Sequence, residues 1–125
     1  MSAEHNPLGW FEIPVTDMDR AVGFYERVLG LPLDMHEMGE ERMAWFPSRP
    51  GEPGCAGALV MAQGYEPSLS GVVIYFTCPD IGETLEKVAE AGGKVLLERT
   101  GIGRYGFVGF LEDSEGNRSG LHSRE

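Results

Sequence analysis

The stretch Trp10–Leu31, WFEIPVTDMDRAVGFYERVLGL, combines a short extended segment with an amphipathic helix. At positions 11, 13 and 15 apolar side chains alternate with those of their neighbours, which is the period-two pattern of a strand with one buried face. Asp17 is a suitable N-cap for the helix and Gly30 a suitable left-handed stop. Between them the apolar residues recur at helical spacing: Met18, Ala21, Val22, Tyr25, Val28 and Leu29. The stretch therefore predicts a strand over residues 9–15 and a helix over residues 18–29.

The second half of the chain predicts the same order of elements. A run rich in β-branched and aromatic residues, 72–77, precedes a helix that starts at Asp80 and stops at Gly92 and Gly93. After each helix come three more extended runs, separated by turns rich in Gly, Pro and Asp: 31–38, 42–46 and 56–62 in the first half, and 94–99, 105–112 and 117–123 in the second.

Equivalent landmarks in the two halves are separated by a nearly constant offset. Asp80 lies 63 positions after Asp17, since 80 − 17 = 63, and the offsets from Gly30 to Gly92 and from Leu59 to Leu121 are both 62. We therefore predict an α+β fold of two βαβββ modules forming a curved mixed sheet around a cleft. The modules are expected at about residues 8–62 and 71–123, within a single domain spanning residues 1–125.

Composition and charge exclude several classes of partner. The formal net charge is −10, and the ten basic residues are scattered along the chain, so nucleic acid is not an expected partner. No run of about 18 apolar residues predicts a membrane span, and residues 1–7 lack the pattern of an export signal. Cys55 and Cys78 lie in dissimilar contexts and are interpreted as small buried hydrophobes in a reducing compartment. The expected location is cytoplasmic.

Trp10–Leu31 resembles the opening of the vicinal oxygen chelate superfamily, which includes glyoxalase I, bleomycin resistance proteins, fosfomycin resistance enzymes and extradiol dioxygenases. The shared features are the extended segment, the aspartate cap, the Arg-Ala to Phe-Tyr helix and the Leu-Gly stop. Glu112–Arg118, EDSEGNR, resembles the acidic turn of that family before its last strand. The resemblance covers residues 8–122. It implies a glyoxalase-like cleft for a small-molecule ligand, and chains of this length in the family are commonly homodimers.

The resemblance also implies where the ligands of a divalent metal would lie. The equivalent positions carry Trp10, Val73 and Gly120, with Ala58 near the fourth. None of these side chains offers a lone pair that suits a metal ion. The usual site is therefore expected to be absent, and the cofactor is left unknown, with a divalent metal held by other residues as an open alternative.

Polar residues two positions further along the same strands suggest another constellation. Because side chains alternate along a strand, Glu12 shares a face with Trp10, and His122 shares one with Gly120. The 63-residue offset pairs Glu12 with Tyr75. We therefore expect Glu12 and His122 as catalytic residues at the cleft floor, with Trp10 and Tyr75 as ligand contacts.

Arg104 lies in a glycine-rich loop, with Gly101, Gly103 and Gly106 nearby. Such a loop could close over a ligand, so Arg104 is a third candidate ligand contact for an anionic group; a solvated arginine is the simpler reading.

Two functions remain open at the level of sequence. A glyoxalase-like lyase or isomerase would use Glu12 as the base and His122 as the acid or orienting group for proton transfer beside a carbonyl. A non-catalytic binder, similar to bleomycin resistance proteins, would sequester a drug or metabolite; an acidic cleft with Trp10, Trp45 or Tyr75 would suit a cation. A subunit with a vestigial cleft is a third reading.

Overall fold

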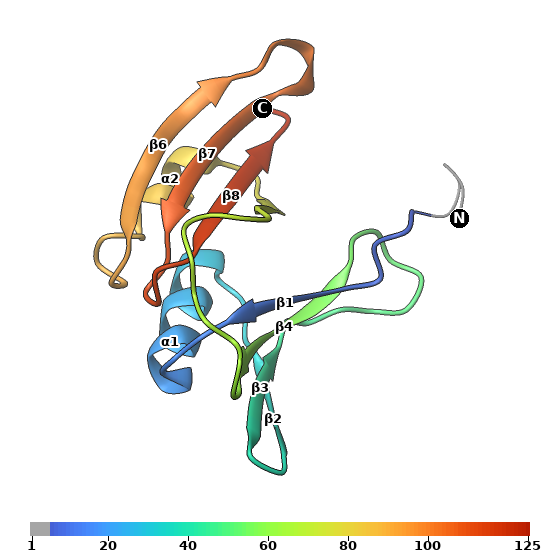
Figure 1. Cartoon of the computed structure of the whole chain (residues 1–125). Helices are drawn as coiled ribbons and strands as arrows, with labels where there is room; N and C mark the ends of the chain where they lie inside the picture. Colours follow the sequence, from blue (N-terminus) through green and yellow to red (C-terminus); the bar gives the residue numbers. More distant parts are fainter. Residues whose placement is uncertain (1–5) are drawn as a thin grey trace.

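A computed structural model describes residues 6–125 of the chain, apart from the side chain of Met38. Two helices and eight strands follow the predicted order (Figure 1). The first half contains β1 (Trp10–Pro14), α1 (Met18–Leu29), β2 (Asp34–Met38), β3 (Glu41–Trp45) and β4 (Ala56–Met61). The second half contains β5 (Ile74–Thr77), α2 (Ile81–Glu86), β6 (Lys94–Gly101), the short 3₁₀ turn η1 (Gly103–Tyr105), β7 (Phe107–Glu112) and β8 (Arg118–Ser123).

The strands form two four-stranded mixed sheets with the same topology. Their orders are β1-β4-β3-β2 and β5-β8-β7-β6, and in each sheet the first strand pairs in parallel with the last. Glu12 lies opposite Ala58 in the first sheet, and Tyr75 lies opposite Gly120 in the second. These pairs are offset by 63 and 62 residues, since 75 − 12 = 63 and 120 − 58 = 62. The α+β fold with two βαβββ modules is confirmed.

Helix α1 has the ends that the sequence predicts, whereas α2 is shorter than predicted. Asp17 accepts a hydrogen bond from the backbone N–H of Arg20, and Gly30 takes a left-handed conformation with φ of 68°. Helix α2 ends at Glu86 instead of reaching Gly92, because Lys87 and Val88 donate to carbonyls three residues back, which tightens the chain into turns. Strand β5 likewise starts two residues later than predicted.

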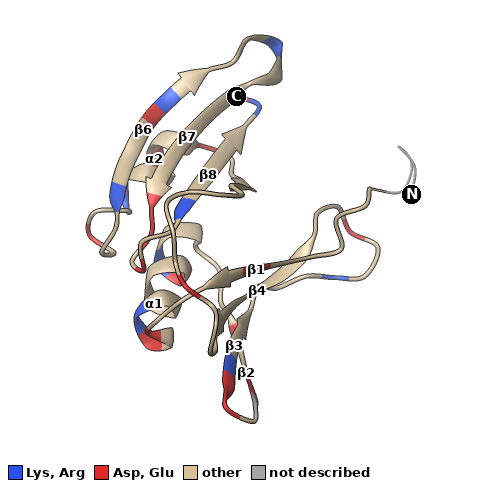
Figure 2. Cartoon of the chain, viewed as in Figure 1, with Lys and Arg blue, Asp and Glu red and all other residues tan. Residues whose placement is uncertain are grey.

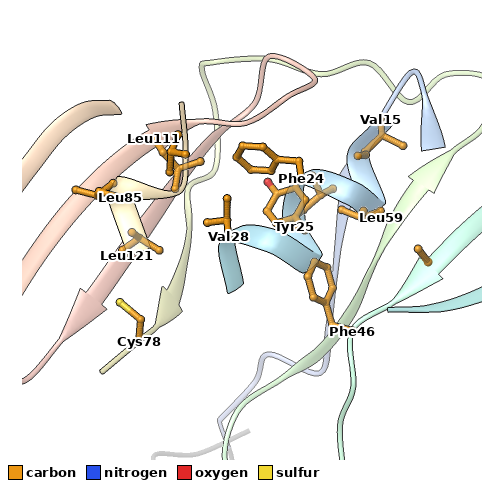
Figure 3. Packing of buried hydrophobic residues seen from close by; sticks show 14 of the residues in the cluster. Val15, Phe24, Tyr25, Val28, Phe46, Leu59, Cys78, Leu85, Leu111 and Leu121 are labelled. Carbon is orange, nitrogen blue, oxygen red and sulfur yellow. The ribbon is translucent and has the colours of Figure 1, made fainter. Parts of the chain in front are cut away.

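One hydrophobic core joins both modules. Phe24, Tyr25 and Val28 on α1 belong to the same buried cluster as Leu85 on α2 and Leu121 on β8, and Figure 3 shows these side chains converging between the helices and the sheets. In β1 and β8 the odd-numbered residues enter this core, so the even-numbered residues lie on the opposite face of each sheet, which we call the helix-free face.

The turn between β7 and β8 ties the two modules together. Asp113 is 2% exposed and accepts a hydrogen bond of 2.6 Å from the Tyr25 hydroxyl. Glu115 binds the N-terminus of α1, accepting from the Arg20 guanidinium and from the backbone N–H groups of Thr16 and Asp17. Both acidic residues of this turn are thus used to hold α1 against the second sheet.

The surface charges are distributed rather than grouped. Lysine and arginine residues occur on α1, on both sheets and in the loops, with acidic residues among them (Figure 2). No helix in residues 6–125 has both the length and the apolar character needed to cross a membrane. Most of the segment on which the absence of an export signal was predicted, residues 1–5, lies outside the described residues.

Candidate functional site

The helix-free face of β1 carries Trp10 and Glu12. Phe11 and Ile13 pack toward the helices, so the alternation of the strand turns Trp10 and Glu12 away from the core, as predicted. Trp10 is 41% exposed, and its ring meets the ring of Trp45 edge to face at 5.4 Å between centroids. A wide indole surface therefore lies open beside a carboxylate.

The carboxylate of Glu12 is held by two donors. One oxygen accepts from the Trp10 indole N–H at 3.2 Å, and the other accepts from the Tyr65 hydroxyl at 2.7 Å. Tyr65 belongs to the connector between β4 and β5, and its hydrogen bond to Glu12, together with the charge of that carboxylate, raises the pKa of the Tyr65 hydroxyl above its ordinary value. Glu12 is thus fixed in position while both oxygens keep a free lone pair.

Tyr75 occupies the matching place in the second module. Its ring is 48% exposed and lies over Gly120, where an added Cβ would stand 2.6 Å from the Tyr75 Cδ2 atom. Phe110 on β7 contacts the other side, with 5.7 Å between ring centroids. Glycine at position 120 is therefore what allows the Tyr75 ring to lie flat across β8.

Trp10, Glu12 and Tyr75 line one cavity of about 730 Å³ where β1 and β5 approach each other. We call it the junction cavity. Its rim includes Leu8, Val72 and Cys55. A second hollow of about 640 Å³ is enclosed by the single loop that runs from Pro47 to Ala56, so it lacks side chains converging from different elements. The junction cavity is the better candidate for a binding site.

His122 lies on the predicted face but outside the junction cavity. Parallel pairing sets it level with Thr77, two pairs beyond Tyr75 and Gly120, and its Nε2 atom is 2.7 Å from the Tyr105 carbonyl oxygen. Because a carbonyl only accepts, Nε2 carries the proton and donates. The structure therefore brings together three residues of the predicted constellation, Trp10, Glu12 and Tyr75, and does not bring His122 to them.

Arg104 lies in the turn η1, where its guanidinium donates to the hydroxyl of its neighbour Tyr105 at 3.0 Å. Both residues are exposed, and neither lines the junction cavity. In this arrangement Arg104 contacts Tyr105 rather than a common pocket with Glu12.

The residues at the expected metal positions do not fit a bound divalent ion. Trp10 and Val73 line the junction cavity with an indole and an isopropyl group, and the Tyr75 ring fills the space in which a longer side chain at Gly120 would begin. Among residues 6–125, no three His, Cys, Asp or Glu side chains lie close enough together to hold a metal ion.

Comparison with known proteins gives the family. Residues 8–120 match the family model of the Glyoxalase/Bleomycin resistance protein/Dioxygenase superfamily. The chain belongs to this superfamily. The match spans β1 through the first half of β8, so it includes both modules and the strands that line the junction cavity.

Individual relatives agree with this assignment. A glyoxylase-like domain-containing protein of Didymella fabae is 29% identical over 124 residues, which are 96% of this chain and 95% of that protein. A putative glyoxylase of Mycobacterium bovis, CFP32, is 30% identical over 117 residues, but the chain spans only 42% of its length. A crystal structure of a glyoxalase-related enzyme from Fulvimarina pelagi superposes with a TM-score of 0.72 at 14% identity, covering 95% of this chain and 88% of that one; this likeness shows the fold.

Sequence reasoning missed two side chains at this site. Tyr65 gave no signal because it lies in an irregular connector. It is 53 positions from Glu12 in the sequence, and only folding brings the two side chains together. Trp45 was considered only as a cation contact, yet it supports Trp10 from β3 and stacks on His36 at 4.0 Å between ring centroids. The alternation of β3 could have placed Trp45 on the helix-free face.

Proposed function

We propose that this protein binds a small organic molecule in the junction cavity, with Trp10, Glu12 and Tyr75 as its contact surface. The observation that carries the proposal is the convergence of two open aromatic rings and a fixed carboxylate on one cavity of about 730 Å³. That volume lies within the range of about 300–1,000 Å³ typical of small-molecule sites. The core that joins both modules supports the view of one glyoxalase-like domain.

The chemistry of the cavity favours a ligand with a positively charged group. Trp10 and Tyr75 present ring faces that attract cations, Glu12 supplies a counter-charge, and the whole chain carries a net charge of −10. Sequestration of a cationic drug or metabolite needs nothing beyond these contacts.

Removal of either cavity aromatic is expected to weaken binding at least tenfold. A central aromatic anchor typically contributes about 2 kcal/mol or more, which exceeds the roughly 1.4 kcal/mol of a tenfold change, and Trp10 and Tyr75 are the large open rings of the junction cavity. Organic cations would be screened by thermal shift, and the dissociation constants of hits measured by calorimetry for the wild type, Trp10→Ala and Tyr75→Ala. Tyr105→Ala is the matched control, since Tyr105 is exposed and outside the cavity. Equal affinities in all four proteins would refute the site.

Proton transfer next to a carbonyl is the second candidate function. It is favoured by Glu12, whose carboxylate lines the cavity and is oriented by Trp10 and Tyr65, as a general base requires. Glu12→Gln is expected to abolish deuterium exchange at the carbon beside the carbonyl of a bound ligand, with a loss of at least 100-fold, while its binding persists. A ligand that binds the wild type without any exchange would leave sequestration as the function. His122→Asn tests whether His122 acts as the acid.

We also propose a homodimer and a cytoplasmic location. Strands β2 and β6 each form one edge of their sheets, at the end away from β1 and β5, and such edges can pair with another copy of the chain. Sedimentation equilibrium should give the mass of two chains, and a single-chain mass at all concentrations would reject the dimer.

The proposed location rests on the cysteines. Both cysteines are free, with Cys78 in the core, which suits a reducing compartment. Fractionation of source cells tests the location.

A further inference from the structure

A smaller cavity of about 230 Å³ lies on the other side of Glu12. It is enclosed by β1, by the connector that follows β4, and by the start of β8. We call it the connector pocket; its charged residues are Glu12, Glu66 and Arg118, and its other polar residues are Asn117 and three serines, at positions 68, 70 and 119. Its volume is below the usual range for drug-sized ligands, so it suits a compact molecule.

Arg118 is the cation of the connector pocket. Its Nε atom is buried without a hydrogen-bond partner, and within residues 6–125 its guanidinium forms no ion pair with a carboxylate. Its closest ring contact is Phe110, at 5.7 Å from the guanidinium carbon to the ring centroid. An arginine that lines a cavity and lacks a counter-charge is suited to a ligand carboxylate, which can accept hydrogen bonds from two of the guanidinium N–H groups.

Two acidic residues line the same pocket. Glu12 and Glu66 are not paired with Arg118, so the three charges sum to −1. A simple anion would be attracted by Arg118 but repelled by the two carboxylates. A simple cation would be attracted by the carboxylates but repelled by Arg118. A molecule with both charges can pair its anionic group with Arg118 and its cationic group with the glutamates at the same time.

The connector is held in place to form this wall. The backbone N–H of Ser68 donates to the Asn117 side-chain oxygen at 3.0 Å, and Asn117 also donates to the Pro14 carbonyl oxygen at 2.7 Å. Asn117 therefore links the connector, the end of β1 and the start of β8. The three walls are fixed relative to one another, which keeps Arg118 and the two glutamates around the same pocket.

We propose that the connector pocket binds a small zwitterion of the α-amino acid type, with its carboxylate on Arg118 and its ammonium group on Glu12 and Glu66. The inference rests on the proposed function in one respect, since Glu12 borders both cavities. A longer ligand could therefore place its aminocarboxylate end in the connector pocket and the remainder against Trp10 and Tyr75.

L-Alanine is the test probe, with propionate and ethylamine as the analogues that lack one charged group each. Trp10 and Trp45 are the two tryptophans of the chain, and the Trp10 indole N–H donates to Glu12, so its ¹⁵N resonance reports on the pocket. We expect a saturable shift of that resonance with L-alanine and at least tenfold weaker binding of both analogues. Absence of a saturable shift, or equal binding of all three compounds, would overturn the inference.

Variants separate this inference from the proposed function. Arg118→Met, and Glu66→Gln at an exposed position of the connector, should each weaken L-alanine binding at least tenfold. Arg49→Gln is the control, because Arg49 is exposed in another loop, and it should leave the affinity for L-alanine unchanged. Trp10→Ala and Tyr75→Ala should weaken organic cations instead. If Glu66→Gln and Arg118→Met bind L-alanine as the wild type does, the connector pocket is rejected while the junction cavity stands. If Trp10→Ala and Tyr75→Ala bind organic cations as the wild type does, while Arg118→Met and Glu66→Gln lose L-alanine binding, the proposed function is rejected and the connector pocket stands.

Discussion

Asp113→Ala is expected to lower the free energy of unfolding by about 3–5 kcal/mol, because it removes one acceptor from several buried donors at once. Asp113 accepts hydrogen bonds from the Tyr25 hydroxyl at 2.6 Å, from the backbone N–H groups of Glu115 and Asn117 at 2.8 and 2.9 Å, and from the Asn117 side-chain amide at 3.1 Å. Urea unfolding at neutral pH measures the loss.

Tyr25→Phe separates the hydroxyl from the rest of this network. Burial raises the pKa of Tyr25 well above its ordinary value, and the nearby Asp113 carboxylate raises it further, so the hydroxyl stays protonated and keeps donating. Removing it should cost about 1–2 kcal/mol, less than Asp113→Ala, since the turn keeps its other bonds. Ser48→Ala, in an exposed loop, is the control and should change stability by less than about 0.5 kcal/mol. An Asp113→Ala protein as stable as this control would disprove the role of the turn.

The architecture could be predicted because its signals are local. Helix α1 has an amphipathic face, an aspartate cap and a glycine stop within 14 positions, and each agrees with the others. Extended runs between turns gave the strands of the second module, and the constant offset indicated that the two modules match. Among the boundaries that differ, the end of α2 lies where local patterns compete with tertiary contacts, because Val88 is fully buried although it has left the helix. Strands β2 and β5 begin three and two residues later than predicted.

The site could be predicted only in part. The alternation of β1 correctly turned Trp10 and Glu12 to one face, and the 63-residue offset between the modules added Tyr75. His122 shows the limit of this reasoning, because a shared face does not fix the distance along a twisted sheet. Tyr65 and Arg118 could not be assigned, since one lies in a connector without periodicity and the other acquires its surroundings only when that connector folds against β8.

Glu115 is expected to make the protein lose stability as the pH falls from about 5 to 2. Burial alone would raise the pKa of Glu115, but hydrogen bonds from Arg20, from the N–H groups of Asp17 and Thr16, and from Ser114 together lower it to about 2. Since the pKa in the folded chain is below the ordinary value of 4.5, the unfolded chain binds the proton first. The stabilisation is complete above the unfolded pKa and disappears as the pH approaches the folded pKa.

Glu115→Gln isolates this contribution. The Arg20 side chain is half exposed whereas that of Glu115 is inaccessible to solvent, so solvent screening limits the ionised contact to about 2–3 kcal/mol. Urea unfolding at a series of pH values should show that the wild type loses this amount more than Glu115→Gln between pH 5 and pH 2. Glu52→Gln, which lies in an exposed loop, should follow the wild type. Parallel curves for the wild type and Glu115→Gln would mean that neutral hydrogen bonds hold α1 to the turn equally well, and that the charge of Glu115 has no part in joining the two modules.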